Sequence, residues 1–527
     1  MAIFTNSFAY DIVTVSLILL ASVIVTFKVC FGYWKRKGVY TPQPGIPFGN
    51  AKDLVLQQVC FGDAIKNAYD AIKKKGFKFG GYYFFMRPIF IPVDLDLIKR
   101  MMTTDFAHFT DHVLHVDEEY DPLSTHLFAM KGSRWKNLRL KLTPTFTSGK
   151  MKMMFQTLVD CSNELAVVID QMVENKTVIE IKEIIGRFTT DIIGSCAFGL
   201  ECNSLKDPNS KFRQNGKKFF DTSLKDSIVR LLSLTVPEFF KIFRVRSHPI
   251  EVTNFFMNVV EQTVKYREQH NIIRTDFMHL LLQIKNNVKI TDTDVGSFKN
   301  STKNGDASLT LSELAAQCFV FFIAGFETSS TTTTFCMYEL CVNSKIQDKL
   351  REEIVAVLKK HNGNLSYDAI MEMTYMDKCV NETLRKYPPV PIHTRECTKT
   401  YKIPNSDVVL KKGTYVFIPA YGVQKDPEHY PDPDKFDPER FSEENKAKRH
   451  PAAWTPFGDG PRVCIGMRFG LMQTKVALAR MLQRYQFSLH SKTTVPIRMD
   501  PGSFVLAADT GVWLVADKLD NIKNNNC

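Results

Sequence analysis

One apolar run near the start of the chain limits its folding more than any other sequence feature. From Ile12 to Phe31 nearly every residue is apolar, with Lys28 as the interruption, and a helix needs about 20 such residues to cross the core of a bilayer. The sequence therefore predicts one N-terminal transmembrane helix, an anchor formed by residues 1–31. A cleaved signal peptide is the alternative, but no basic segment precedes the run and no clear small-residue cleavage site follows it.

Basic and proline-rich residues come next. Residues 35–37 are Lys-Arg-Lys, and no Lys or Arg precedes Lys28, so the positive-inside rule places the rest of the chain in the cytosol. Pro-Gln-Pro-Gly-Ile-Pro at 42–47 predicts a stiff, non-helical spacer, because proline fixes its backbone angle and lacks an amide donor. We expect a hinge at 32–47 and one large domain at 48–527, since no break in composition divides it.

Charge and cysteine content narrow the function classes. The formal charge of +12 fits a membrane surface or an acidic partner as well as nucleic acid. No nucleic-acid-binding module is recognisable, so we expect no nucleic-acid partner. The 12 Cys in 527 residues are too dilute for a disulfide scaffold, and none forms a Cys-x-x-Cys pair, which fits a reducing compartment.

Periodicity predicts a mainly α fold with minor β-sheets. Helical patterns dominate the first three hundred residues, which show little strand signal; they cover 51–75, 150–174, 180–196 and 249–282. Short strands are expected at 400–410 and 414–418. An irregular, proline-rich meander follows at 426–440, before a final helix that starts near Ile465.

The most informative predicted helix begins after a polar loop at 285–308. Thr310 and Glu313 form a capping box, and the helix then runs to about Cys341, on the order of 45 Å. Its centre, Ala324 to Ser330 followed by four Thr, combines a glycine with β-branched residues. We expect a local distortion of the helix there.

The strongest indication of chemistry is Phe-Gly-Asp-Gly-Pro-Arg-Val-Cys-Ile-Gly at 457–466. Cys464 lies where a loop enters a helix, so backbone amides and the helix dipole can stabilise a thiolate. Glycines on both sides allow a large planar group to approach the backbone. Such a thiolate is a natural axial ligand for haem iron, whereas each of the other cysteines is most simply a small buried hydrophobe.

This loop resembles the haem-binding signature of the cytochrome P-450 superfamily. The resemblance implies haem b (iron protoporphyrin IX) as cofactor, Cys464 as the proximal iron ligand, and Gly466 as part of the signature. It also implies that Phe457 packs near the sulfur and that Arg462 pairs with a haem propionate. Further expected propionate contacts are Trp135 and Arg139, which share one face of a predicted helix, and Arg395.

Two more sets of residues resemble that family in order and spacing. Glu382 and Arg385, joined by Arg440, are expected to form a buried network of two guanidinium groups around one carboxylate; an exposed helix ion pair is the alternative. Gly325, Glu327 and Thr328 resemble the oxygen-activation motif. An acid beside a hydroxyl can relay protons through water, and the alternative is a Thr-rich surface turn.

The resemblance implies a haem-thiolate monooxygenase, with 48–527 as its catalytic domain, that inserts one atom of O2 into a lipophilic small molecule. Segments 121–128 and 141–151 are most similar to insect microsomal, xenobiotic-metabolising members. That likeness implies the endoplasmic reticulum membrane and substrates such as plant toxins or insecticides. Oxidation of an endogenous lipid or hormone, a thiolate-haem isomerase or dehydratase that uses no O2, and a non-catalytic haem-binding protein are the alternatives.

One departure concerns the loop at 109–113. The insect branch commonly has Phe-x-Asp-Arg-Gly, whereas this chain has Phe-Thr-Asp-His-Val, which removes one expected propionate contact. Candidate substrate-pocket residues, all of which could instead be plain core, are Phe106, Phe109, His112, Val113, Phe322, Ala324, Val390 and Ile392. The apolar segment 231–243, with Phe239 and Phe240, could dip into the bilayer or be buried in the domain.

Electrons must come from a partner, because no dinucleotide or Walker fingerprint is present. The resemblance implies NADPH-cytochrome P-450 reductase, with cytochrome b5 as a candidate second donor. A basic face is the expected docking site, and a merely solvated basic surface is an equal alternative. Its proposed residues are Arg134, Lys136, Lys141, Lys150, Lys152 and Arg468.

Overall fold

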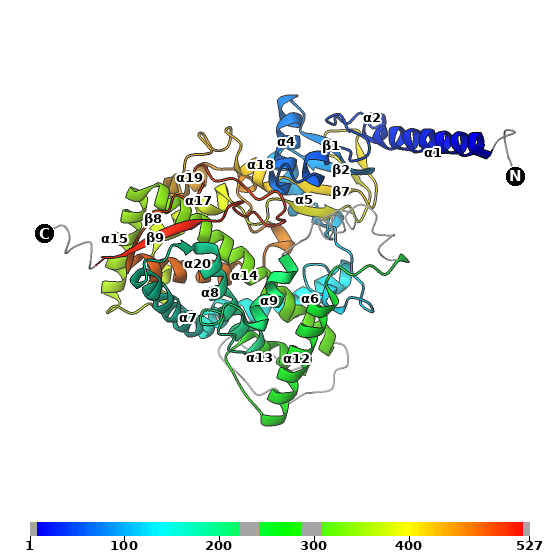
Figure 1. The fold of residues 1–527 in the computed structure, drawn as a ribbon. Coiled ribbons are helices and arrows are strands. Elements are labelled where there is room, and N and C mark those ends of the chain that lie inside the picture. The colour runs from blue at the N-terminus through cyan, green and yellow to red at the C-terminus, as the bar shows by residue number, and fades with distance from the viewer. Residues whose placement is uncertain (1–7, 221–241, 287–307, 520–527) are drawn as a thin grey trace.

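The computed structural model describes residues 8–220, 242–286 and 308–519, and shows a mainly helical body from which one helix projects (Figure 1). That helix, α1 (Phe8–Phe31), is long and apolar enough to span a membrane from Ala9 to Phe31, and none of its most apolar window is buried. It agrees with the predicted anchor. The central helix α14 (Leu311–Val342) is also long and apolar enough to span a membrane, but it is mostly buried, as expected of a core helix.

The chain just after α1 is fixed to the body. Trp34, in the short helix α2 (Tyr33–Arg36), is fully buried. Its backbone amide donates to the Tyr83 hydroxyl at 3.0 Å, and that hydroxyl donates to the Phe31 carbonyl at 2.7 Å. The first residues of the predicted hinge therefore belong to the core of the body.

Four strands form the sheet beside this junction. They are β1 (Phe79–Phe84), β2 (Arg87–Pro92), β7 (Tyr415–Ile418) and β4 (His393–Glu396), in the order β1-β2-β7-β4. Only the β2–β7 pairing is parallel. The sequence did not predict β1 and β2, because Gly80 and Gly81 weaken the strand pattern. A Cβ on Gly81 would lie 2.3 Å from the Trp34 ring, so packing requires the glycine there.

Two smaller sheets complete the β structure. The predicted strand region 400–410 forms a hairpin of β5 (Tyr401–Lys402) and β6 (Val409–Leu410). The other sheet has the order β3-β9-β8 and was not predicted; its strands are β3 (Ile179–Glu180), β8 (Tyr485–Leu489) and β9 (Trp513–Lys518). This sheet pairs two strands near the end of the described chain with β3, about three hundred residues earlier.

Helices make up most of the body (Figure 1). Those not yet given are α3 (Lys52–Val55), α4 (Phe61–Lys74), α5 (Leu95–Met102), α6 (Gly132–Leu142), α7 (Ser148–Glu174), α8 (Ile181–Ile193), α9 (Lys211–Phe220), α12 (Ile250–His270), α13 (Phe277–Lys285), α15 (Ser344–Lys360), α16 (Tyr367–Glu372), α17 (Thr374–Lys386), α18 (Ala420–Gln424), α19 (Glu443–Lys448) and α20 (Met467–Leu482). The region 249–282 is two helices, because Asn271 adopts a left-handed conformation and ends α12. Likewise, 51–75 is divided into α3 and α4.

The central helix α14 begins with the predicted capping box of Thr310 and Glu313. It continues as an unbroken α-helix through 324–330, so the expected distortion was wrong. Hydroxyl groups in this stretch donate to carbonyls of the preceding turn, for example Thr328 to Ala324 at 2.6 Å and Thr333 to Ser329 at 2.9 Å. These bonds, with burial against α8 and α20, outweigh the weak helix propensity of the stretch.

Candidate functional site

An accessible stripe interrupts the buried surface of α14. Between Leu314 and Leu340 every residue is buried except Phe321, Ala324, Gly325 and Thr328, and spacings of three, four and seven place these on one helix face. Cys464 is also exposed, alone among the cysteines that the structure describes. The central helix therefore has one accessible surface within the protein body. The loop at 457–466 that carries Cys464, called the cysteine loop below, has another.

Phe146 links these two surfaces. Its ring lies 5.2 Å from the Phe321 ring, and its Cε1 is 3.9 Å from the place that a Cβ on Gly466 would take. Phe457 is partly buried and packs against the core, 6.5 Å from the ring of Trp454. The stripe and the cysteine loop therefore border a common internal site.

The loop that carries Cys464 is shaped by glycines. Gly458 and Gly460 have φ of 73° and 67°, and a Cβ on Gly460 would lie 2.0 Å from the Met102 carbonyl. Although Cys464 is accessible within the site, the protein around it desolvates the thiol and raises its pKa, whereas the Gly466 amide and the charge of Arg139 oppose that rise. Bound iron would favour the thiolate form of Cys464, because a cysteine binds metal as the thiolate.

Three arginines gather at the same site. Arg395 and Arg462 are buried and Arg139 is partly buried. Burial lowers the pKa of Arg395 to about 10. Burial, with the charges of Arg395 and Arg139, lowers the pKa of Arg462 to about 9, and the carboxylate of Asp111, 3.8 Å away, opposes this only in part.

This cluster fits a dianionic, planar group. Within the described chain, the Nε of Arg395 is buried and has no hydrogen-bond partner, which is costly unless a bound group accepts from it. Arg462 donates to the carbonyls of Thr110 and Met130, both at 2.8 Å, and its guanidinium lies 4.0 Å above the Trp135 ring. Two carboxylates beside these side chains would relieve their repulsion, so the residues fit haem with its propionates.

His112 occupies the position of the sequence departure. Its Nδ1 lies 3.0 Å from the Thr394 carbonyl and 3.3 Å from the Arg395 guanidinium, and its ring lies 4.4 Å from that of Phe128. Burial, followed by the charges of Arg395 and Arg462, holds its pKa well below the usual range. The chain therefore has a neutral ring where an arginine would have added another cation to the cluster.

The structure brings Glu382, Arg385 and Arg440 together. Arg385 donates to both carboxylate oxygens of Glu382, at 2.7 and 2.9 Å, and both side chains are fully buried. Arg440 lies 3.4 Å from the same carboxylate and donates to the carbonyls of Pro431 and Asp432. The network joins α17 to the irregular segment that precedes the cysteine loop.

The acid and the hydroxyl of the predicted relay lie on neighbouring faces of α14. Thr328 is on the accessible stripe, whereas Glu327 forms an ion pair with Lys182 of α8 at 2.7 Å. Gly325 has a packing role, because a Cβ there would lie 2.5 Å from Cδ1 of Ile193. Lys182 was missed by sequence reasoning, since nothing in the chain links it to a residue 145 positions away.

The proposed pocket residues separate into two groups. Ala324 and Val390 are accessible or partly so. The others are partly or fully packed into the hydrophobic clusters, with His112 placed as above: Phe106 on Trp135, Phe109 on Tyr401, Phe322 on Phe212, and Val113 and Ile392 in the cluster around the four-stranded sheet. Most of the segment 231–243, including Phe239 and Phe240, lies outside the described residues.

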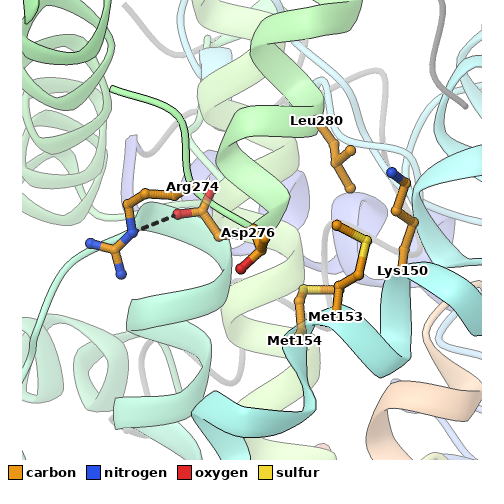
Figure 2. A pocket seen from close by; sticks show the side chains of 7 residues that line it. Lys150, Met153, Met154, Arg274, Asp276 and Leu280 are labelled. Carbon is orange, nitrogen blue, oxygen red and sulfur yellow. Dashed lines mark ion pairs between the residues drawn. The ribbon is translucent and has the colours of Figure 1, made fainter. Parts of the chain in front are cut away.

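Several residues of the predicted basic face have other roles. Lys150 is 2% exposed and lies beside Met153 and Leu280 in a small pocket, not on the surface (Figure 2). Arg134 pairs with Glu118 and Lys152 with Asp368. Both of these basic side chains are exposed despite their ion pairs, so Arg134 and Lys152 stay candidates for a basic docking face, together with Lys136, Lys141 and Arg468.

A cysteine that can bind iron, together with two buried arginines and one partly buried arginine that can hold propionates, fits the haem-thiolate class of enzymes. The family model described as cytochrome P-450 matches residues 42–515, and the chain belongs to this family. It is therefore a P-450 monooxygenase with haem as its cofactor. In general terms, membership brings a redox partner and a lipophilic substrate.

The chain is similar to several insect proteins over almost its whole length. Probable cytochrome P-450 6a14 of Drosophila melanogaster is 43% identical over 93% of this chain and 96% of its own. Cytochrome P-450 6A1 of Musca domestica is 40% identical, covering 92% and 93%. Cytochrome P-450 6k1 of Blattella germanica is 39% identical, covering 95% and 96%.

Proposed function

We propose that this chain oxidises lipophilic foreign compounds, such as plant toxins or insecticides, at the endoplasmic reticulum membrane. The observation that carries the proposal is the accessible stripe of α14, with Ala324 and Thr328, at the site of Cys464. An apolar wall next to a hydroxyl suits a substrate without charge. The similarity to insect relatives supports the xenobiotic class.

Each group of the site has a separate task in this proposal. Cys464 would hold haem through its sulfur, and haem, when bound, would supply the oxygen-activating chemistry. Arg139, Arg395 and Arg462 would hold the propionates by charge-assisted hydrogen bonds. Thr328 and Glu327 hold and move protons, because a hydroxyl and a carboxylate are the donor and acceptor that such a relay requires.

The residues that flank α1 support a position for the body at the membrane. The basic residues at 35–37 follow the apolar helix, which favours a cytosolic body held at the membrane surface. We propose that NADPH-cytochrome P-450 reductase delivers electrons there, with cytochrome b5 as a second donor. The docking candidates are Arg134, Lys136, Lys141, Lys152 and Arg468.

Oxygen consumption tests the proposal. The full-length protein would be reconstituted with reductase and lipid, and NADPH use, O2 uptake and product would be measured with a panel of plant toxins and insecticides and a matched panel of endogenous lipids and hormones. We expect substrate-dependent O2 uptake with the first panel. Faster turnover of the second panel would replace the xenobiotic role with a biosynthetic one.

The ferrous carbonyl spectrum checks the ligand assignment in the same samples. Wild type should give a thiolate-type band, and Cys464→His should give an imidazole-type band, because sulfur and nitrogen donate electron density to the iron differently. Cys397→Ser, at a buried cysteine next to Glu396, is the matched control and should keep the thiolate-type band. An unchanged spectrum in Cys464→His would contradict the assignment.

A further inference from the structure

The loop that carries His112 is held at the site from two sides. The Arg462 guanidinium donates to the Thr110 carbonyl at 2.8 Å, and the Glu396 amide donates to the Asp111 carbonyl at 2.8 Å. The exposed fraction of His112 itself is 6%. A side chain that is buried and fixed in this way acts on its neighbours from a constant position, so its charge matters to the site.

Hydrogen bonds determine which ring nitrogen of His112 carries the hydrogen. Nδ1 lies 3.0 Å from the Thr394 carbonyl, and a carbonyl can only accept, so Nδ1 is the donor. The Arg395 guanidinium donates to the same carbonyl at 2.9 Å. Both side chains share this acceptor, and the neutral ring lies 3.3 Å from the guanidinium without bringing a second positive charge there.

The charges next to His112 match those of two propionates. Arg139, Arg395 and Arg462 supply three positive charges, and the Asp111 carboxylate, 3.8 Å from Arg462, offsets one of them. The remaining two positive charges equal the two negative charges of the propionates. We call these three arginines and the aspartate the propionate cluster.

Two further titratable neighbours add no net charge. Burial lowers the pKa of His393 to about 4, so this ring is neutral near pH 7, and its Nε2 lies 2.7 Å from the Thr455 carbonyl. Glu396 forms an ion pair with Lys131 at 2.7 Å. The residue at position 112 therefore decides whether the propionate cluster is balanced or has one surplus positive charge.

We propose that His112 keeps the propionate cluster free of surplus charge and thereby holds the reduction potential of haem lower than a cation at this position would. Reduction adds one electron to the haem iron, and the redox partner supplies that electron. A buried cation nearby would stabilise the added negative charge, because the protein interior screens charges poorly, and the potential would rise. The inference depends on haem binding beside Cys464 and is independent of the proposed substrate class.

A potentiometric titration of the substrate-free holoenzyme tests the inference. The ratio of ferrous to ferric haem is followed by its absorption spectrum while dithionite supplies electrons through redox mediators. In His112→Arg and His112→Lys we expect this ratio, at a fixed potential, to rise about tenfold, equivalent to a potential about 59 mV higher for one electron. One unit charge acting across about 10 Å at an effective dielectric constant of about 20 has an effect of this size.

Two control variants separate charge from packing. His112→Gln is neutral and can still donate to the Thr394 carbonyl, so its potential should match that of wild type. Gln156→Lys adds a positive charge at an exposed position of α7, where water and salt screen it, and should also leave the potential unchanged. If His112→Gln raised the potential as much as His112→Arg, the effect would not come from charge and the proposal would be overturned.

Haem retention gives a second measurement on the same variants. Both charged variants should retain haem on purification at least as well as His112→Gln, because the propionates attract the added cation. Wild-type potentials in both charged variants, or loss of haem from both, would reject the role of His112. Because no substrate is present, these results do not depend on which compounds the enzyme oxidises, and failure of the xenobiotic panel would leave them unaffected.

Discussion

At the scale of single residues, the buried carboxylate of Glu382 holds separate parts of the chain together. Glu382 is fully buried and is compensated by Arg385 in a bidentate pair and by Arg440 at 3.4 Å. Both arginines also donate to backbone carbonyls of the irregular segment 431–435. A carboxylate in this position holds two parts of the chain in one geometry, so its removal affects more than one contact.

Glu382→Gln should therefore destabilise the protein strongly. The amide retains the size of the side chain but leaves the buried Arg385 and the partly buried Arg440 without their anion, and breaking a buried pair costs about 3–5 kcal/mol. The thermal unfolding midpoint and the amount of haem retained on purification measure this. Glu443→Gln, at an exposed pair with Lys446, is the control and should change neither; equal behaviour of both variants would contradict the network.

Among elements, α8 and α14 pack closely against each other at the site. Gly325 permits it, because a Cβ at that position would lie 2.5 Å from Cδ1 and 3.1 Å from Cγ1 of Ile193. Sequence similarity associates this glycine with oxygen activation. The structure gives it a packing role, and the distance between two helices explains why a side chain is absent.

Gly325→Ala should be tolerated and Gly325→Val should not. The tip of Ile193 can move aside for one methyl group, and the higher helix propensity of alanine, about 1 kcal/mol, offsets the remaining strain. Valine overfills the contact and should cost about 1–3 kcal/mol of unfolding free energy. Chemical denaturation would measure the unfolding free energy lost in Gly325→Val. Adding Ile193→Ala to that variant should recover part of the lost free energy. Simple addition of the two losses would argue against the contact.

The anchor helix α1 is joined to the body through contacts of the residues at its C-terminal end. Trp34 is fully buried three residues after α1 ends, and the Phe31 carbonyl accepts from Tyr83. Deletion of residues 1–30 should release the protein from membranes and leave its unfolding midpoint nearly unchanged. Deletion of 1–37 also removes Trp34 and should cost about 3–5 kcal/mol. Membrane flotation and thermal unfolding separate these effects; equal midpoints would contradict the role of Trp34.

For the whole molecule, buried histidines set a stability limit at low pH. Burial, the largest cause, lowers the pKa of His126 to about 3 and that of His393 to about 4, and nearby positive charge also holds His112 well below its usual range. The unfolded chain binds protons at these groups near pH 6.5, whereas the folded chain does not. Stability must therefore fall as pH decreases below about 6.5.

The decrease in unfolding free energy per pH unit can be measured. Each such histidine contributes up to about 1.36 kcal/mol per pH unit between the unfolded and folded pKa values. His393→Gln, which can still donate to the Thr455 carbonyl, should reduce the slope between pH 6 and 5 by about one proton. His270→Gln, at an exposed histidine, should leave it unchanged. A slope that does not respond to His393→Gln would contradict the burial argument.

The sequence by itself determined those features that depend only on residues close together in the chain. The apolar run, the capping box at Thr310, the glycine-rich loop around Cys464 and the Tyr401–Leu410 hairpin are all local patterns, and each forms where it was expected. Local patterns are readable because their physics, such as bilayer thickness, cap geometry and turn conformation, involves only nearby residues.

The tertiary structure alone decided which distant groups meet. It placed Lys182 on Glu327, Trp34 against Gly81, and Ile193 against Gly325. It also buried Lys150, which sequence reasoning had placed on a basic surface. Such contacts depend on how helices cross and how strands pair over long separations, and a single chain carries no periodicity that records them. The sequence around Cys464 therefore indicated the chemistry, whereas the distant residues that pack around the site were identified only in the folded chain.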